Sequence, residues 1–333
     1  MSPSTTEAPD VTAVALDGAA IVQMLKPGSA KTFSEYAHSV FIPHIMAMYR
    51  GDVSRVDLVW DQYIPNSLKQ TTRSRRGRGV RRRVVSEGKI PGNWHSFLRV
   101  DENKTELSVF LSDALLRSFT STENMWLIVT YGNMVRSKPD IPVRQESQLA
   151  LCPHEEADSR IFLHAAHAAD HGHSKLMIRT VDTDIVVLAV SVVQDLPTDV
   201  QLWVKFGTGT HTGYIAAHEL AHRLKPEKAK VLPLFHALTG CDTVSAFAGH
   251  GKKSAWTTWD ALPALTGALL ELHNHPNKLC EDAISTVVRI VIVMYDRTST
   301  AIALEIARKK LYLKKQDPEK IPPSKGALSQ HLK

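Results

Sequence analysis

The sequence is poor in cysteine and lacks any long apolar run. Its three cysteines, Cys152, Cys241 and Cys280, form no CxxC pair, which argues against a disulfide framework and a cysteine zinc site and fits a reducing compartment. No apolar stretch reaches the roughly 18 residues of a membrane-spanning helix, because Arg289 interrupts the best candidate, residues 284–295. We therefore expect a protein that neither depends on disulfides nor enters a membrane.

A secretory signal is also lacking, since residues 1–10 are polar and contain proline. The composition is that of a globular protein: 333 residues, 43% of them hydrophobic, with a net charge of +6. This length suffices for one large α/β domain or two smaller ones. We expect an intracellular protein, located in the nucleus rather than the cytoplasm.

The positive charge is concentrated in one stretch. Residues 69–83, KQTTRSRRGRGVRRR, contain one lysine, seven arginines and no acidic residue. Such a run can be a solvated loop, a phosphate-binding element or a nuclear-import signal. The acidic residues that flank this stretch favour the phosphate-binding interpretation.

Three predicted strands are each followed directly by an aspartate. The pairs are 11–16 with Asp17, 56–60 with Asp61, and 176–181 with Asp182 and then Asp184. The carboxyl ends of parallel strands meet at one edge of a sheet. In extended chain, residues two apart point the same way, so we expect Asp182 and Asp184 to aim at one point, although a solvated turn also explains them. The predicted fold is α/β, with a Rossmann-like, mostly parallel central sheet flanked by helices and a C-terminal helical region.

Further acidic residues extend this set. Glu155, Glu156 and Asp158 stand at a predicted helix start, where acids also suit the positive end of the helix, and Asp242 follows a later helix. Crowded carboxylates are costly unless divalent cations neutralise them, and oxygen ligands suit Mg²⁺ or Mn²⁺ rather than zinc. Two such ions, roughly 4 Å apart, would activate a water and stabilise the leaving oxygen of a phosphodiester.

Five segments together carry a resemblance to a known family. In chain order they read VALDGAAIV, VDLVWDQYIPNSLKQTTRSRR, CPHEEADSR, TVDTDIVVL and LTGCDTVSAFAGHGKKSA. Each is short, but five in this order are more specific than any one of them. Over residues 11–260 the chain resembles flap endonuclease and its XPG-like relatives in the PIN-like nuclease superfamily. The resemblance implies a metal-dependent, structure-specific nuclease that acts on DNA in preference to RNA.

The same resemblance implies roles for individual residues. The metal ligands would be Asp17, Asp61, Glu155 or Glu156, Asp158, Asp182, Asp184 and Asp242, with Glu156 and Asp158 as the better register. Contacts to the scissile phosphate would come from Lys69, Arg73 and Arg76, and further nucleic-acid contacts from Arg73, Arg75, Arg76 and Arg78. A helix-hairpin-helix-like turn at 240–256 would bind a DNA phosphate, with a monovalent cation, through Gly249, Gly251, Lys252 and Lys253.

The pattern along the chain predicts its organisation. We expect a disordered N-terminus (1–10), a nuclease domain (11–260) with a basic flap (62–91), a helical extension (261–313) and a polar tail (314–333). Residues 136–147 are expected to form a polar connection. Other expected elements are helices over 32–49 with a kink at Pro43, 104–118, 214–224, 231–238, 281–295 and 299–312, and strands over 125–130 and 200–206.

Three alternatives stay open. His218, Glu219 and His222 form an HExxH match on a predicted helix, which would place two zinc ligands and a general base of a metalloprotease on one face. A second zinc site could come from His164, His167, His171 and His173, although a solvated helix face explains these histidines equally simply. Finally, a nuclease fold can serve as a catalytically inactive nucleic-acid-binding or scaffold protein, because a fold does not fix a function.

Overall fold

The chain divides into two compact units, Met1–Leu220 (unit 1) and Ala221–Lys333 (unit 2). The computed structural model describes residues 4–63, 79–122, 124–141, 149, 157–242, 244–278, 280–315, 317 and 320–332. The division comes earlier than the expected boundary at residue 260. Val231, Phe235 and Trp259 share one hydrophobic core with Val287 and Ile290, so residues 221–260 pack with the later helices.

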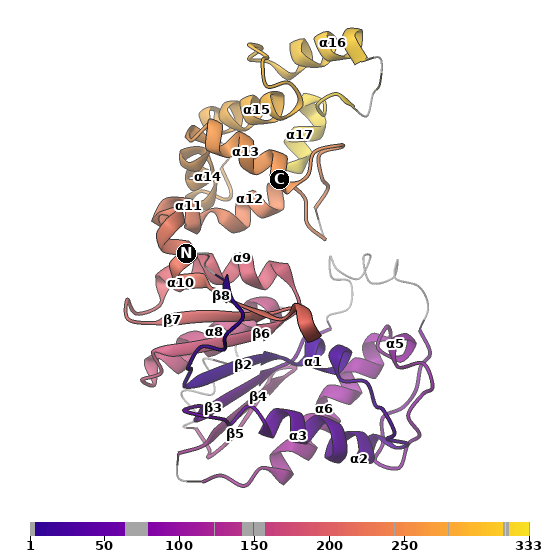
Figure 1. Ribbon diagram of the computed structural model, residues 1–333. Helices are drawn as coiled ribbons and strands as arrows, with labels where there is room; N and C mark the ends of the chain where they lie inside the picture. The colour runs from indigo at the N-terminus through magenta and orange to yellow at the C-terminus, as the bar shows by residue number, and fades with distance from the viewer. Residues whose placement is uncertain are drawn as a thin grey trace. The chain divides into compact units, whose positions relative to one another are not determined.

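Unit 1 is built on an eight-stranded sheet with the order β1-β8-β7-β6-β2-β3-β4-β5 (Figure 1). The central strands β7, β6, β2, β3 and β4 are parallel to one another, and β8, β1 and β5 add antiparallel edges. The predicted fold class is therefore confirmed. The strands are β1 Ser4–Thr5, β2 Ala13–Asp17, β3 Arg55–Val59, β4 Trp126–Tyr131, β5 Met134–Lys138, β6 Lys175–Thr180, β7 Gln201–Phe206 and β8 Gly213–Ala216.

The order of the strands places a crossover point next to β2. From β2 the chain adds β3 and then β4 on one side, and it later adds β6 and β7 on the other side. In open α/β sheets, the crevice outside the carboxyl ends of the strands at such a reversal is where ligands bind. The carboxyl ends of β3, β2 and β6 are therefore the first place to look for a site.

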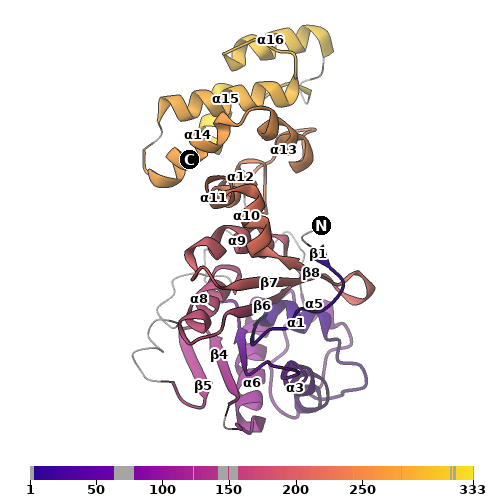
Figure 2. The same ribbon diagram turned by 60° about the vertical axis from the view of Figure 1, so that its left-hand side comes forward.

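Helices cover both faces of this sheet (Figure 1 and Figure 2). On one face, Leu16 and Leu58 of the sheet share a core with Ile21, Phe41 and Leu111. On the other face, α8 packs against β2, β3 and β6 and against α9. The helices of unit 1 are α1 Gly18–Met24, α2 Phe33–Tyr36, η1 Ala37–Phe41, α3 Ile42–Met46, α5 Trp94–Phe97, α6 Asp101–Ser118, α8 Ala157–Asp170, α9 Thr183–Val192, η2 Val193–Asp195 and η3 Gly209–His211.

The helix expected over 32–49 with a kink at Pro43 is instead a run of three segments. The chain passes from α2 through η1, a π-helix, into α3. Thr32 caps the start, because its hydroxyl accepts a hydrogen bond from the Glu35 amide at 3.2 Å. Pro43 has no N–H and its ring crowds the carbonyl one turn back, which accounts for the wider turn directly before it.

Several segments that look irregular in the sequence form regular structure. Ser4 pairs with Ile215, so the expected disordered N-terminus contributes β1. The expected connection over 136–147 begins as β5, and the expected helix over 214–224 begins as β8 and continues as α10 Ala217–Leu224. β1 pairs with a strand far along the chain, so no local pattern marks it. β5 and β8 pair with β4 and β7, the strands directly before them, and are short and only partly buried.

Unit 2 is helical in its described part. The predicted helix over 281–295 is confirmed, and the expected polar tail contains α17, whose Leu328 is buried. Among the described residues, none of the helices combines the length and the apolar character needed to cross a membrane. The helices of unit 2 are α11 Pro226–Lys230, α12 Leu232–Leu238, α13 Lys252–Ala261, α14 Ala264–Asn274, α15 Glu281–Tyr295, α16 Leu304–Lys315 and α17 Lys325–His331.

Candidate active site

Asp17 lies at the centre of the carboxyl edge of the sheet. It is the last residue of β2, it is only 6% exposed, and its Oδ1 accepts a hydrogen bond from the Ala20 amide at 3.0 Å, which caps α1. Burial, then the negative charge of Asp61 and finally that of Asp182, raise the pKa of Asp17 from 3.8 to about 7, against the lowering effect of backbone amides. The ends of β3, β2 and β6 thus bring three carboxylates within electrostatic reach of one another.

Asp61 follows β3 and connects this edge to the start of α8. Its Oδ1 accepts a hydrogen bond from the Ala157 amide at 2.9 Å, and its Oδ2 accepts one from the Tyr63 hydroxyl at 3.1 Å. Ala157 is the first residue of α8, so Asp158 stands next in sequence to a group that touches Asp61. Burial and the charge of Asp61 raise the pKa of Tyr63 well above its usual value. The Tyr63 hydroxyl therefore stays protonated and acts as a hydrogen-bond donor to Asp61.

Tyr63 was not among the residues singled out from the sequence. The Lys104 ammonium lies over the Tyr63 ring, 4.0 Å from its centroid, in a cation–π contact. Tyr63 therefore connects α6 to the candidate site. The only sequence signal was its position two residues after Asp61. That spacing has no general meaning in a loop, and the contact depends on the tertiary fold.

Asp182 and Asp184 follow β6, but they are not in extended chain. Asp182 has φ −93° and ψ 130°, and its Oδ1 accepts a hydrogen bond from the Asp184 amide at 2.8 Å, so it is the N-cap of α9. Asp184 lies in the first turn of that helix. The expectation that the two side chains point the same way by strand alternation is therefore wrong, because capping starts the helix one residue after Asp182.

A close contact between two elements fixes the backbone around Asp17. Gly18 begins α1, and a Cβ atom added there would lie 2.5 Å from the Trp60 ring. Trp60 is buried and stacks on Phe41 with ring centroids 6.1 Å apart. Only glycine at position 18 leaves room for the Trp60 ring against the start of α1. Trp60 directly precedes Asp61 in the chain, so this contact also fixes the backbone next to Asp61.

The donor set suits a hard divalent cation by its chemistry. Asp17, Asp61 and Asp182 offer only oxygen, and burial together with mutual repulsion makes a shared positive charge favourable. Among the described residues, no three His, Cys, Asp or Glu side chains lie close enough together to hold one ion. Glu155, Glu156, Lys69, Arg73, Arg75, Arg76 and Arg78 lie outside the described residues, and their roles stay predictions.

Asp242 and the predicted helix-hairpin-helix turn belong to unit 2. Asp242 is exposed and follows α12. In the turn, Gly249 has φ +74° and Gly251 is the N-cap of α13. The participation of Asp242 in a metal site stays a prediction.

Lys252 has partners within unit 2. Its Nζ donates to the carbonyls of His236 at 2.9 Å and Gly240 at 2.6 Å and to the Thr239 hydroxyl at 3.3 Å. An ammonium at the carboxyl end of α12 satisfies carbonyls that the helix leaves unpaired. Lys252 therefore has a structural role, although it is exposed, as is Lys253. Phosphate and monovalent-cation binding at this turn stay predictions.

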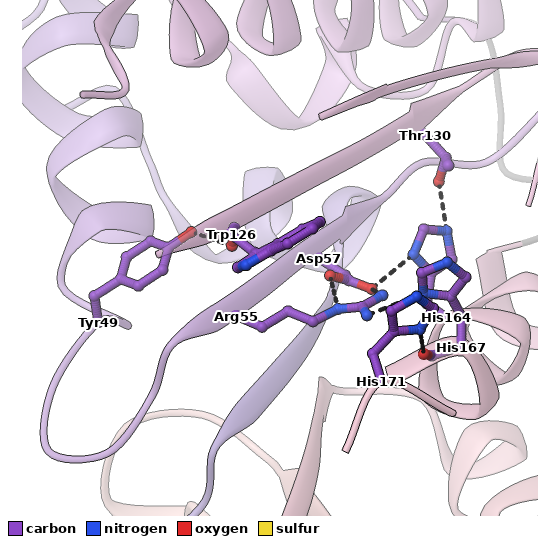
Figure 3. Close-up of polar contacts among 8 residues, drawn as sticks. All are labelled: Tyr49, Arg55, Asp57, Trp126, Thr130, His164, His167 and His171. Atoms are coloured by element: carbon purple, nitrogen blue, oxygen red, sulfur yellow. Dashed lines mark hydrogen bonds and ion pairs between the residues drawn. The ribbon is translucent and has the colours of Figure 1, made fainter. Parts of the chain in front are cut away.

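A buried polar cluster on the other side of β3 was missed from the sequence (Figure 3). Arg55 donates from Nε and Nη2 to the two carboxylate oxygens of Asp57, at 2.8 and 2.7 Å, and from Nη1 to Nδ1 of His167 at 3.0 Å. His164 bridges Asp57 at 2.9 Å and the Thr130 hydroxyl at 3.1 Å. The signal was available: Arg55 and Asp57 alternate with Val56 and Leu58 within one strand, which puts both charges on the same face.

This cluster contradicts the zinc hypothesis for the four histidines. Both ring nitrogens of His164 are hydrogen-bonded within the protein. His171 stacks on His167 with ring centroids 4.1 Å apart, and its Nδ1 forms a hydrogen bond with the His167 carbonyl. Nδ1 of His173 forms a hydrogen bond with the Thr12 hydroxyl. His164 and His167 are thus buried in an ion-pair network, whereas His171 is exposed and His173 is half-buried.

The HExxH match lies on α10, as predicted. His218 uses Nδ1 on the Leu202 carbonyl at 3.1 Å, and its ring meets the Trp203 ring edge-on. Within the part of the chain that the structure describes, no third ligand joins His218 and His222. Nothing in the described structure supports the metalloprotease alternative.

Comparisons with known proteins find similar solved structures. No protein-family model matches the chain, and no curated protein matches it significantly. Similar solved structures include the T5 D15 protein co-crystallised with metal ions, at 14% identity and TM-score 0.40, covering 91% of this chain and 98% of that one. They also include two structures of the catalytic core of Rad2 in complex with DNA substrate, both at 13% identity, with TM-scores of 0.42 and 0.40, covering 97% of this chain and 93% of the chain in those structures. At this level the likeness concerns the fold alone.

Proposed function

We propose that the protein is a metal-dependent phosphodiesterase that cleaves nucleic acid, DNA in preference to RNA, at the carboxyl edge of its sheet. The observation that carries this proposal is the arrival of Asp17, Asp61 and Asp182 at one edge, from three neighbouring parallel strands. Each aspartate also accepts an amide at the start of a helix, but helix capping does not require that the three carboxylates share one edge. A site for divalent cations explains them together.

The residues around the edge hold these carboxylates in place. The Ala20, Ala157 and Asp184 amides each donate to one of the three aspartates, and the Tyr63 hydroxyl donates to Asp61. Each aspartate therefore has one oxygen fixed by a hydrogen bond from its own surroundings. Carboxylates oriented in this way bind a cation without first losing conformational freedom.

No three of the described acidic side chains lie close enough to hold one ion by themselves. Mg²⁺ or Mn²⁺ would therefore take ligands from Asp17, Asp61 and Asp182 together with water and the further predicted ligands Asp158, Asp184, Glu155 or Glu156, and Asp242. When bound, such ions lower the pKa of a water nucleophile and stabilise the leaving oxygen of a phosphodiester. The arginine-rich stretch 69–83 begins a few residues after Asp61 in the chain and would hold the anionic substrate by charge. We also propose a nuclear location, for which the arginine-rich stretch would act as an import signal.

Cleavage of flapped, single-stranded and duplex DNA, and of matching RNA, tests the proposal. The wild type should cut at least one of them in Mg²⁺ or Mn²⁺ and none in EDTA. Asp182→Asn should lose cleavage by at least about 100-fold while keeping the cap of α9, because asparagine is also a good N-cap. Asp195→Asn is the matched control, since Asp195 is exposed at the other end of the same helical segment. Equal cleavage by the wild type and Asp182→Asn would reject the assigned site.

A further inference from the structure

Unit 1 contains a second feature that the carboxylate edge does not explain. A hollow of about 1040 Å³ lies between the loop that follows α1 and the segment that leads into α5. Its rim carries the exposed lysines Lys26, Lys31 and Lys89, and its floor includes the buried residues Pro91 and Trp94. We call this feature the lysine hollow. Its volume is above the usual range of small-molecule pockets, about 300–1,000 Å³, and suits an open path for a larger ligand.

Backbone hydrogen bonds hold the two walls of the lysine hollow together. Thr32 and Lys89 form an antiparallel bridge. The Ile90 amide donates to the Lys31 carbonyl at 2.8 Å, and the Phe33 amide donates to the Gly88 carbonyl at 3.0 Å. Lys31 and Lys89, 58 positions apart in the sequence, are therefore fixed on paired segments, and their like charges cannot move apart by backbone motion without breaking these bonds.

The three lysines have no anionic partner in the described structure. No ion pair involves Lys26, Lys31 or Lys89 among the described residues. Two glutamates also line the hollow, but Glu35 accepts the Lys31 backbone amide at 2.7 Å and Glu87 accepts the Ser86 hydroxyl at 3.2 Å. These hydrogen bonds leave both carboxylates charged, so the three lysines outnumber the two glutamates and the lining has a net positive charge that attracts an anion.

The floor of the hollow is rigid and apolar. The Trp94 indole N–H donates to the Val22 carbonyl at 2.9 Å, and its ring packs against Tyr36 and Phe97 with centroids 4.9 and 5.1 Å away. An apolar floor in a hollow that three lysines also line suits a ligand that has several negative charges and less polar parts between them. A strand of nucleic acid has that character, whereas inorganic phosphate would use only the charges.

The lysine hollow lies one short helix away from the carboxylate edge. α1 begins directly after Asp17 and ends at Met24, two residues before Lys26. Seven residues of helix span ~10 Å at 1.5 Å per residue. A strand with a phosphate near Asp17 would reach the lysines within about three nucleotides, at ~3.4 Å per nucleotide along one strand of a duplex.

We propose that the lysine hollow binds the phosphates of one strand of the nucleic-acid substrate, a few nucleotides from the bond that is cut, through Lys26, Lys31 and Lys89. This inference rests on the proposed function for the identity of the ligand. It adds a second anchoring point that is separate from the arginine-rich stretch. Each lysine acts as a point charge on a phosphate and confers no preference for a base sequence.

Binding without cleavage gives the first test. Fluorescence anisotropy in EDTA would follow single-stranded oligodeoxynucleotides of increasing length, from 4 to about 20 nucleotides, at several salt concentrations. The variant is Lys26→Gln/Lys31→Gln/Lys89→Gln. The matched control is Lys309→Gln/Lys310→Gln/Lys314→Gln, which removes three exposed lysines from α16, also without ion pairs in the described structure. Circular dichroism and thermal unfolding verify that both variants fold.

The hollow variant should bind at least 10-fold more weakly than the wild type at low salt. Its plot of log K against log salt should be flatter by about 2, since each lost phosphate contact to a single strand contributes about 0.7. The control should behave as the wild type. A slope unchanged in the hollow variant, or lowered equally in the control, would overturn the proposal. Competition by inorganic phosphate or by a polyglutamate peptide that is as strong as competition by the oligonucleotide, at equal concentrations of negative charge, would also overturn the proposal.

The outcome separates this inference from the proposed function. Loss of binding in the hollow variant, with no cleavage by the wild type in Mg²⁺ or Mn²⁺, would keep the lysine hollow as a binding site and reject the nuclease. Cleavage by the wild type, with an unchanged salt slope in the hollow variant, would keep the nuclease and reject the lysine hollow. If both hold, cleavage of strands shortened on one side of the cut should fall once fewer than about three nucleotides remain there.

Discussion

Asp17 and Asp57 lie on neighbouring strands of the same sheet and are almost equally buried, at 6% and 2% exposure, yet their surroundings are opposite. Asp57 has a bidentate partner in Arg55 and a hydrogen bond to His164 (Figure 3). Burial opposes its ionisation, but Arg55 and His164 outweigh burial and hold the pKa of Asp57 far below its usual value. Asp17 faces Asp61 and Asp182 instead, and its pKa rises to about 7.

The difference shows which acid the fold has already neutralised and which it has not. A buried carboxylate with its own cation is a structural element, whereas a buried carboxylate that meets other carboxylates is neutralised by a proton or by a cation from outside. The Arg55–Asp57 pair connects β3 to α8 and Thr130 of β4. The Asp17 group stands where the sheet meets solvent. The predictions below test this contrast, starting with the largest expected effect.

Removing the cation of the first region should be the most damaging change. Arg55→Met leaves Asp57 buried beside His164 alone, and loss of one member of a buried ion pair costs about 3–5 kcal/mol. Urea unfolding followed by circular dichroism would measure it. Arg55→Met/Asp57→Leu, which replaces the pair by apolar side chains, should regain most of the loss. A loss below about 1 kcal/mol in the single variant would show that Arg55 does not neutralise Asp57.

Neutralising the acid of the second region should have the opposite sign. Asp17→Asn keeps an oxygen for the Ala20 amide and removes the repulsion from Asp61 and Asp182. At pH 8 in EDTA the variant should be more stable than the wild type by as much as about 4 kcal/mol, because each pKa unit corresponds to ~1.36 kcal/mol. Urea midpoints at pH 8 measure the change. Reduced stability would mean that Asp17 has a favourable partner in the fold.

The close packing beside Asp17 should make an added methyl group at Gly18 destabilising. Gly18→Ala puts a methyl group 2.5 Å from the Trp60 ring, and overpacking of this kind costs about 1–3 kcal/mol. Gly267→Ala is the matched control, because Gly267 is helical and has open space around it, and it should be neutral or slightly stabilising. Thermal unfolding compares the two. Equal behaviour would show that Trp60 moves aside freely.

A further effect should appear in the dependence of stability on pH. Burial and the charge of Arg55 lower the pKa of His167 from 6.5 to about 4, so the unfolded chain binds a proton first, and stability is lost as the pH falls from about 6.5 to about 4. Asp17 acts the other way: the folded state holds the extra proton, and stability is lost as the pH rises from about 4 to about 7.

His167→Gln separates the two contributions, because glutamine can still accept from Arg55. In an Asp17→Asn background, His167→Gln should flatten the rise in stability between pH 4.5 and 6.5, measured by urea midpoints at three pH values. If the stability of Asp17→Asn and of Asp17→Asn/His167→Gln rises equally steeply with pH, groups other than His167 cause the dependence.

The sequence predicted those features that a short segment determines by itself, such as an apolar run followed directly by an aspartate. Asp17, Asp61 and Asp182 each follow an apolar run, and the parallel arrangement of β2, β3 and β6 needed only the rule that parallel strands end at one edge. The predicted fold class depended on the same runs. α15 was also found to the residue, because fifteen residues of periodic apolar pattern leave little choice.

The rest depends on contacts between distant segments. Tyr63 reaches Asp61, Lys31 lies beside Lys89, and Arg55 meets His167 only after the chain has folded. The orientation of Asp184 depends on the capping bond of Asp182, which competes with the strand periodicity used to predict it. Short edge strands such as β1 and β8 exist through their pairing and have no pattern of their own.

The central claim is that divalent cations neutralise the carboxylates at the end of β2, and thermal unfolding at pH 8 in EDTA and in a series of Mg²⁺ concentrations tests it most directly. Mg²⁺ that binds the folded state should stabilise the wild type by about 2.7 kcal/mol at 100 times its dissociation constant, and Asp17→Asn should lose most of this response while Asp195→Asn keeps it. An identical response to Mg²⁺ in the wild type and Asp17→Asn, or no response in the wild type, would contradict the account.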